Sequence, residues 1–376
     1  MGKPPVARVD APLLPLLRQR IAAEGPITVA AFMADCLLHP EHGYYRTREA
    51  IGLGGDFTTA PEISQMFGEL LGLWAADIWQ KLGAPARCYL VELGPGRGTL
   101  MRDALRAARA LPAFRAAVQP LLVEASERLR GVQREALADE AIAWHDDVAG
   151  LPKDAPLIVL ANEFLDALPV RQFQRGDDDG WHERRVGLAD DGQTLRFVLD
   201  PRSLPFEDLL PPELRDAPHG VIVESSPAVR AVTGEVAARL RDQGGAALFV
   251  DYGYDKPGFG ETLQAVFRHA YTDPFAEPGM ADLTAHVDFV SVDRAARHAG
   301  ATVHGPRGQG AFLQALGIAM RAEKLKAHAA PGKGADIDRD LHRLTAPEEM
   351  GTLFKVLALT PAASPSSAGF VPAGFA

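Results

Sequence analysis

The stretch VELGPGRGTL, residues 91–100, decides how this chain folds. A short apolar run at 88–93 leads into three glycines, Gly94, Gly96 and Gly98, and a sequence with helical character follows. A strand that ends in a glycine-rich turn and continues as a helix is typical of the ligand-binding edge of an open α/β sheet. The stretch therefore predicts a small-molecule site at the carboxyl end of the first strand of such a sheet.

The sequence after this turn alternates between strands and helices. Apolar runs at 119–126, 141–148 and 155–164 have the length of strands, and a helical segment lies between the first two of them. The run at 155–164 is apolar almost throughout, as expected for a strand that is covered on both faces. With the further strands that the sequence predicts at 245–254, 301–306 and 353–361, the count is seven. This rhythm predicts an α/β fold with a seven-stranded, mostly parallel, Rossmann-like sheet.

Several segments are expected to lie outside this sheet. Residues 1–83 form a helical N-terminal cap with a loop that closes the pocket, and residues 84–361 form the core. Within the core, 170–223 is expected to be a β insertion and 310–347 a helical insertion. The segment 362–376 is rich in Ala, Ser, Gly and Pro, so we expect a flexible tail.

Composition narrows the class of protein. The chain has 376 residues, a net charge of −10 and 47% hydrophobic residues, which argues against a nucleic-acid binder. Two cysteines far apart in the sequence do not suggest a disulfide framework. We find no apolar run of about 18 residues that could span a membrane, no secretory signal and no transit peptide. These features predict a cytoplasmic protein.

The spacing of the glycines discriminates between two cofactors. A dinucleotide site has the pattern G-x-G-x-x-G, but the third glycine is replaced here by Thr99. Glu92 lies two residues before Gly94, where its charge would repel a pyrophosphate. A carboxylate suits the ammonium group of S-adenosylmethionine, which carries no phosphate. We therefore expect S-adenosylmethionine, held by Glu92 and the glycines, with an NAD(P)-dependent oxidoreductase as the alternative.

Two further acids are candidates for cofactor binding. Glu124 ends the second strand, where an acid usually accepts hydrogen bonds from the two ribose hydroxyls. Asp147 ends the third strand and could accept one from the adenine amine. The alternatives are a helix-capping acid at Glu124 and a solvated turn at Asp147.

The fourth strand ends in three polar residues, Asn162, Glu163 and Asp166. Polar groups at the end of a buried strand are not explained by packing. We expect Asn162 on the cofactor side, while Glu163 and Asp166 could bind and orient a guanidinium group in bidentate fashion. Helix N-capping by Asn162 or Asp166 is the alternative.

The segment 267–289 is expected to be a long loop that follows the fifth strand. Its His286 could position an acceptor or take a proton, although a purely structural histidine is an equal alternative. The spacing of histidines matches no zinc motif and no cysteine cluster accompanies them, so we expect no metal site.

Seven motifs resemble, in order, those of the MidA-like family of S-adenosylmethionine-dependent protein-arginine methyltransferases, the type that assists complex I assembly. They are FMADCLLHPEHGYY, GGDFTTAPEISQMFGELLG, VELGPGRGTL, LANEFLDALPVRQF, FVDYGY, ADLTAHVDF and EMGTLFKVLAL. The resemblance covers most of the chain, about 26–359. It implies a class I methyltransferase fold and symmetric dimethylation of an arginine in the complex I subunit beside the quinone site.

The resemblance also implies roles for individual residues. Gly94, Gly96 and Gly98 would hold the cofactor, Glu124 would bind its ribose, and Asp56 and Phe57 would belong to the loop that closes over the pocket. The implied partner is a protein substrate, and the implied location is the mitochondrial matrix if the source is eukaryotic. A non-catalytic assembly chaperone that keeps the cofactor for stability is a second alternative. The oligomeric state stays open, a homodimer included.

Overall fold

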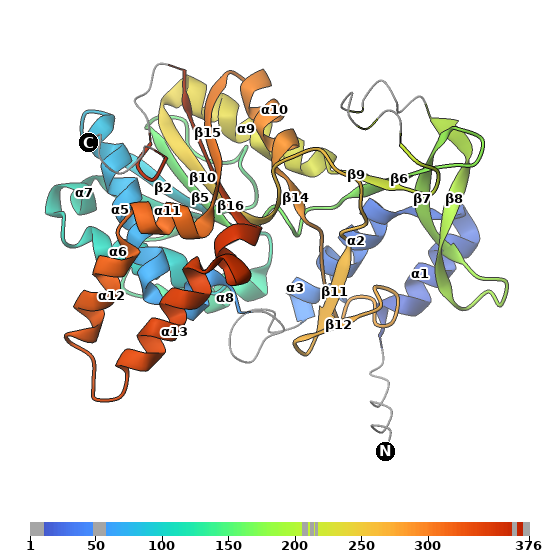
Figure 1. Cartoon of the computed structure of the whole chain (residues 1–376), viewed down its shortest axis with the longest axis horizontal. Coiled ribbons are helices and arrows are strands. Elements are labelled where there is room, and N and C mark those ends of the chain that lie inside the picture. The colour runs from blue at the N-terminus through green and yellow to red at the C-terminus, as the bar shows by residue number, and fades with distance from the viewer. Residues whose placement is uncertain are drawn as a thin grey trace.

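The computed structural model of the chain (Figure 1) describes residues 11–47, 58–204, 210, 214, 217–362 and 367–370. Its largest sheet has the strand order β4-β3-β2-β5-β10-β16-β15. These strands are β2 (Cys88–Leu93), β3 (Val118–Val123), β4 (Ala143–His145), β5 (Leu157–Asn162), β10 (Gly245–Tyr254), β15 (Ala301–Gly308) and β16 (Phe354–Pro361). All pairs from β4 to β10 are parallel, whereas β16 is antiparallel to both of its neighbours. The predicted seven-stranded sheet is confirmed, and an extra strand, β14 (Val287–Asp288), pairs with the end of β10.

Helices cover both faces of this sheet because its central strands are apolar on both sides. One face packs against α5 (Gln65–Lys81), α6 (Thr99–Ala108), α7 (Pro112–Ala117), α11 (Gln309–Ala315), α12 (Ile318–Lys326) and α13 (Gly334–Thr345). The other face packs against α9 (Pro227–Gln243) and α10 (Phe289–His298). The helix α8 (Glu127–Ala136) follows β3, and a short helical segment with a kink at Glu349 spans Pro347–Gly351. Every strand and helix that the sequence predicted in the core is present.

The cap and the β insertion pack on each other, which the sequence did not predict. The helices α1 (Leu13–Glu24) and α2 (Val29–Leu38) share one hydrophobic core with the insertion. The insertion strands are β6 (Arg171–Arg175), β7 (Trp181–Leu188), β8 (Leu195–Leu204) and β9 (Ile222–Ser225). A two-residue strand of the cap, β1 (Ile27–Thr28), pairs with β7, so cap and insertion form one lobe beside the large sheet (Figure 1).

The expectation of a loop over 267–289 was wrong. A three-stranded sheet is formed there by β11 (Gln264–Phe267), β12 (Ala270–Thr272) and β13 (Asp282–Thr284). The hairpin turns at Arg268 and His269, whose φ values of 52° and 61° lie in the left-handed region. Such a turn normally carries Asn-Gly, so the sequence lacks the usual hairpin signal.

Part of the tail is packed. Ser367 is fully buried, and its Oγ accepts a hydrogen bond of 2.8 Å from the indole nitrogen of Trp74 on α5. Cys36 and Cys88 are both buried free thiols. Across the described ranges, no helix combines the length and apolar character that a membrane crossing requires.

The contact between α5 and α6 depends on a glycine, which gives a first testable prediction. A Cβ on Gly72 would lie 2.7 Å from the Cα of Ala104 and 2.6 Å from its carbonyl oxygen. Gly72→Ala is therefore expected to push the helices apart and to lower the free energy of unfolding by about 1–3 kcal/mol. Gly131→Ala on α8 is the matched control, because a Cβ at that position would have no atom within 4 Å. Urea unfolding measures the midpoint of each variant. A midpoint of Gly72→Ala equal to that of the parent chain and of Gly131→Ala would contradict this prediction.

Candidate active site

The glycine turn after β2 has the backbone that its sequence requires. Gly94, Gly96 and Gly98 have φ values of 61°, 52° and 81°, all in the left-handed region where glycine is favoured. A Cβ on Gly94 would approach Cδ2 of Phe164 to 2.7 Å. The turn therefore tolerates no side chain at this position and brings backbone directly to the edge of the sheet.

Two buried acceptor atoms near this turn have no hydrogen-bond partner among the described residues. They are Oε2 of Glu92 and Oδ1 of Asn162. Only 3% of the surface of Glu92 is exposed. Burial raises the pKa of Glu92 well above its ordinary value, and a hydrogen bond from the backbone N–H of Met101 opposes this shift only in part. Glu92, Asn162 and Gly94 line one cavity of about 40 Å³. Unpaired buried acceptors beside a cradle of glycines fit the cationic ammonium group of S-adenosylmethionine.

Glu124 lies beside the same turn. One carboxylate oxygen accepts from the backbone N–H of Ser126 at 2.7 Å, and the other accepts from Nε2 of Gln133 at 3.3 Å. The same Nε2 donates to the carbonyl oxygen of Gly96 at 2.9 Å. Burial is the main reason that the pKa of Glu124 is raised. Gln133 thus links the acid to the turn, a contact that the sequence did not suggest.

Asp147 follows β4 at the same edge of the sheet but is exposed. Its Oδ1 accepts from the backbone N–H of Gly150 at 2.8 Å and closes a turn. The neighbouring Asp146 pairs with Arg130 at 2.6 Å. The solvated turn that the sequence left as an alternative is present, and an adenine contact by Asp147 stays a prediction.

The cap reaches the glycine turn through α4 (Ala60–Ile63). Glu62 on α4 accepts a hydrogen bond from Thr99 Oγ1, at the start of α6. Pro61 and Glu62 of α4 form part of the wall of the cavity of about 40 Å³ beside the glycine turn. The expected pocket-closing residues Asp56 and Phe57 lie outside the described residues.

Glu163 occupies a sharp turn directly after β5, with a φ of 48°. Its Oε1 accepts from the backbone N–H of Ala60 at 3.0 Å and from Nδ2 of Asn162 at 3.1 Å. Burial, together with the negative charge of Asp166, raises the pKa of Glu163 to about 8. A left-handed backbone at a non-glycine residue is rare and often marks a functional position.

Asp166 lies close to Glu163 and is also buried. Its Oδ2 accepts from the hydroxyl of Tyr252 at 2.6 Å, and burial raises its pKa to about 6. Asp282, from β13, accepts from the hydroxyl of Tyr45 at 3.2 Å. Three carboxylates, two from the turn after β5 and one from β13, thus converge in a buried region, which favours a cationic ligand between them.

The turn that carries Glu163 is held by Asp251, which the sequence did not single out. One oxygen of Asp251 accepts from three successive backbone N–H groups, those of Phe164, Leu165 and Asp166, at 3.1, 2.9 and 3.3 Å. Burial and the charges of Asp166 and Glu163 raise the pKa of Asp251 well above its ordinary value. We therefore regard Asp251 as a positioning residue.

Replacement of Asp251 should reveal this role. Asp251→Ala removes the acceptor of the three N–H groups of 164–166 and of the Tyr252 N–H, which donates to the other oxygen at 3.0 Å. Each unpaired group costs about 1–3 kcal/mol, so the free energy of unfolding should fall by at least about 3 kcal/mol. Asp251→Asn keeps one carbonyl oxygen at the same place and should recover most of the loss in urea unfolding. Equal destabilisation by Ala and Asn would contradict the proposed contact.

His286 faces the same region. Its backbone N–H donates to Thr262 Oγ1 at 2.9 Å, and its ring lies edge-to-face with Tyr252 at 5.5 Å. Burial lowers the pKa of His286, so the imidazole is neutral at pH 7 and able to accept a proton. His286, Tyr252 and Glu163 line a second cavity of about 340 Å³, with Tyr271 and Leu353 exposed around it.

Among the described lining residues, Glu163 is the one that the two cavities share. One cavity contains the glycine turn and the other contains His286 and Tyr252. A group held by the glycines and a group that enters beside His286 would meet at this carboxylate. Within the described ranges, no group of three or more His, Cys, Asp or Glu side chains has the arrangement of a metal site.

Comparisons with known proteins agree with this geometry. The model of a family of S-adenosyl-L-methionine-dependent methyltransferases matches residues 70–307. The chain is 39% identical to the Drosophila melanogaster protein arginine methyltransferase NDUFAF7 homolog, mitochondrial, over 92% of this chain and 84% of that protein. It is 36% identical to the human protein arginine methyltransferase NDUFAF7, mitochondrial, over 96% and 86%.

A solved structure extends the likeness to the fold. A Burkholderia thailandensis protein bound to S-adenosyl-homocysteine is 31% identical, with a TM-score of 0.85 and coverage of 98% of both chains. These matches set aside the NAD(P)-dependent alternative, and the pattern of Glu92 and Thr99 that argued against a pyrophosphate agrees with them. The chain therefore belongs to the MidA-like family of S-adenosylmethionine-dependent methyltransferases, and its cofactor is S-adenosylmethionine.

Proposed function

We propose that this protein transfers a methyl group to an arginine side chain of a protein partner. The observation that carries the proposal is the position of Glu163, a buried carboxylate shared by the cofactor cavity and the cavity lined by His286. The names of the relatives support an arginine acceptor. A guanidinium is planar and cationic, so it pairs well with carboxylates in bidentate fashion.

Different residues of the chain would bind different parts of the cofactor. S-adenosylmethionine supplies an electrophilic methyl group when bound. Glu92 and Asn162 would hold its ammonium group, because their buried oxygens lack partners. Glu124 would accept hydrogen bonds from the ribose, with Gln133 fixing the acid to the glycine turn.

Glu163 and Asp166 would orient the guanidinium. A carboxylate that faces one edge of a guanidinium draws positive charge toward it and leaves the opposite nitrogen more able to attack. The nitrogen that receives the methyl group from the cofactor would give up one proton. Glu163, with its raised pKa, or the neutral His286 can accept this proton.

We extend the proposal to the acceptor and the place of action. Following the family resemblance, we propose symmetric dimethylation of an arginine in the complex I subunit beside the quinone site, in support of complex I assembly. The protein would act in the cytoplasm of a bacterium or in the mitochondrial matrix of a eukaryote. The test is a comparison of the intact masses of complex I subunits from cells with and without this protein.

Two outcomes of that comparison are informative. A subunit that is lighter by about 28 Da in the deletion strain, the net difference for two hydrogens replaced by methyl groups, supports the proposal, and fragmentation then assigns the arginine. Unchanged masses combined with a loss of assembled complex I would contradict catalysis and favour the non-catalytic chaperone.

The raised pKa values predict how the reaction responds to pH. Burial disfavours the charged carboxylate, so Glu163 and Asp166, with pKa values of about 8 and 6, take up protons at higher pH than ordinary acids. A protonated acid attracts a guanidinium weakly, so kcat/KM for the acceptor should rise as the pH increases from about 6 to 8. A profile that is flat over this range would contradict the assigned role of the two acids.

A further inference from the structure

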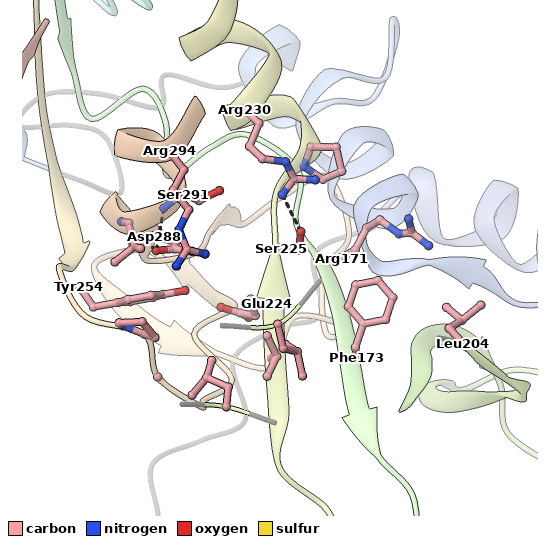
Figure 2. Close-up of a pocket in the computed structure, with 17 residues that line it drawn as sticks. Arg171, Phe173, Leu204, Glu224, Ser225, Arg230, Tyr254, Asp288, Ser291 and Arg294 are labelled. Atoms are coloured by element: carbon pink, nitrogen blue, oxygen red, sulfur yellow. Dashed lines mark hydrogen bonds between the residues drawn. The ribbon is translucent and has the colours of Figure 1, made fainter. Parts of the chain in front are cut away.

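A larger cavity lies away from the methyl-transfer site, between the β insertion and the helices α9 and α10 (Figure 2). Its volume of about 580 Å³ falls in the range of small-molecule pockets. It shares no described lining residue with the cavity of Tyr252 and Glu163. Neither the fold nor the reaction proposed above requires an opening of this size at this place.

One side of this cavity is apolar. The β insertion contributes Phe173 from β6 and Val223 from β9, together with Leu204, Leu210 and Leu214. Phe173, Val223, Leu210 and Leu214 belong to one hydrophobic cluster, so this wall is part of the packed interior of the insertion. This wall suits the apolar part of a ligand rather than a polar part.

The other side carries two arginines from different helices. Arg230 lies near the start of α9 and Arg294 lies midway along α10, and both extend toward the space above Glu224 (Figure 2). Arg230 donates one hydrogen bond, from Nη1 to Ser225 Oγ at 2.8 Å. We find no hydrogen bond or ion pair from the Arg294 guanidinium to any other described residue. A guanidinium has five N–H donors, so most donors at this rim remain available.

The carboxylates of the cavity are already engaged by other groups. Glu224 accepts from Gln172 Nε2 at 2.8 Å, from the backbone N–H of Thr262 at 3.0 Å and from the Thr262 hydroxyl. Asp288 accepts from the first backbone N–H groups of α10, those of Val290 and Ser291, at 3.0 and 3.2 Å. These donors hold both carboxylates in place. The charge of Asp288 also attracts Arg294 and Arg230, but no hydrogen bond joins either arginine to it among the described residues, so their N–H donors can still bind an anion.

We infer that this cavity binds a small organic carboxylate with an apolar body, such as a medium-chain acid. The carboxylate lies between Arg230 and Arg294, and the apolar body lies along Phe173 and Val223. A guanidinium pair suits a carboxylate because each can donate two parallel hydrogen bonds. The inference does not depend on the acceptor proposed above.

Calorimetric titration of the full-length protein with decanoate tests the inference. We expect saturable binding at one site, with decanol and decyltrimethylammonium at least about tenfold weaker because they cannot pair with the arginines. Saturation with S-adenosylhomocysteine beforehand should leave decanoate binding unchanged. Equal binding of the three compounds, or loss of decanoate binding after addition of S-adenosylhomocysteine, would overturn the inference.

Variants locate the site. Arg230→Gln combined with Arg294→Gln should weaken decanoate binding at least about tenfold, whereas Arg297→Gln, further along α10 and outside the cavity, should not. Ser291→Phe keeps both arginines and fills the cavity, so it should also abolish binding. Thermal unfolding confirms that each variant is folded, and decanoate binding retained by the double arginine variant or by Ser291→Phe would refute the assignment.

Discussion

Replacing Glu163 by glutamine is expected to lower the rate of methyl transfer by at least about a hundredfold while S-adenosylmethionine still binds. Glutamine has the same shape, and its oxygen can still accept from Ala60 and Asn162, so the turn should survive. Above pH 8, where Glu163 is ionised, only the negative charge that would orient the guanidinium is lost, so the two proteins are compared at about pH 9. Single-turnover assays with an isotope-labelled methyl donor measure the rate, and calorimetry measures cofactor binding.

The prediction for Glu163→Gln has a matched control and two results that would contradict it. Glu41→Gln removes a carboxylate whose side chain is 80% exposed, and it should leave both readouts unchanged. If Glu163→Gln turns over at the rate of the parent chain, Glu163 takes no part in methyl transfer. Loss of cofactor affinity in this variant would instead mean that Glu163 belongs to the cofactor site alone.

The second large effect is expected for Gly96→Val, which should weaken S-adenosylmethionine binding by more than about a hundredfold. Gly96 has a φ of 52°, a conformation that a β-branched residue essentially does not adopt. The backbone would have to change, and the carbonyl oxygen that Gln133 holds at 2.9 Å would move with it. Glu124, bound to the same Gln133, would lose its support.

Gly131→Val on α8 is the matched control for this variant. It adds the same side chain at a helical glycine where a Cβ would have no atom within 4 Å, so cofactor binding should be retained. Circular dichroism verifies that both variants are folded, and calorimetry gives the affinities. Tight cofactor binding by Gly96→Val would show that the glycine turn does not form the site.

The core of the fold could be predicted because its signals are local. Each central strand is a short apolar run, and the strand-turn-helix pattern at Gly94–Gly98 indicates which edge of the sheet is functional. Parallel strands all end at that edge, so Glu92, Glu124 and Asn162 could be assigned to one site without knowledge of their distances.

The parts that escaped prediction depend on contacts between distant segments. Asp251 reads as an ordinary residue of a strand, and its role appears only when β10 lies beside β5 and the N–H groups of 164–166 turn toward it. The pairing of β1 with β7 joins Ile27 to Val186, which are far apart in the sequence. The hairpin at Arg268 and His269 was missed because neither residue is a usual turn former at positive φ.

The sequence and the structure together narrow the role of His286. From the residues alone, a structural and a functional histidine were equal alternatives. The fold places its ring against Tyr252, beside the cavity that Glu163 also lines, so a functional role becomes the more specific hypothesis. Its role in proton transfer nevertheless stays a proposal that the pH profile can test.

The most direct test is a crystal structure of this protein soaked with S-adenosylhomocysteine. We predict density along Gly94–Gly98, with the amino group on Glu92 or Asn162, the ribose on Glu124, and the sulfur end directed toward Glu163. An empty glycine turn, with the compound in the cavity of Arg230 and Arg294 or elsewhere, would contradict the account.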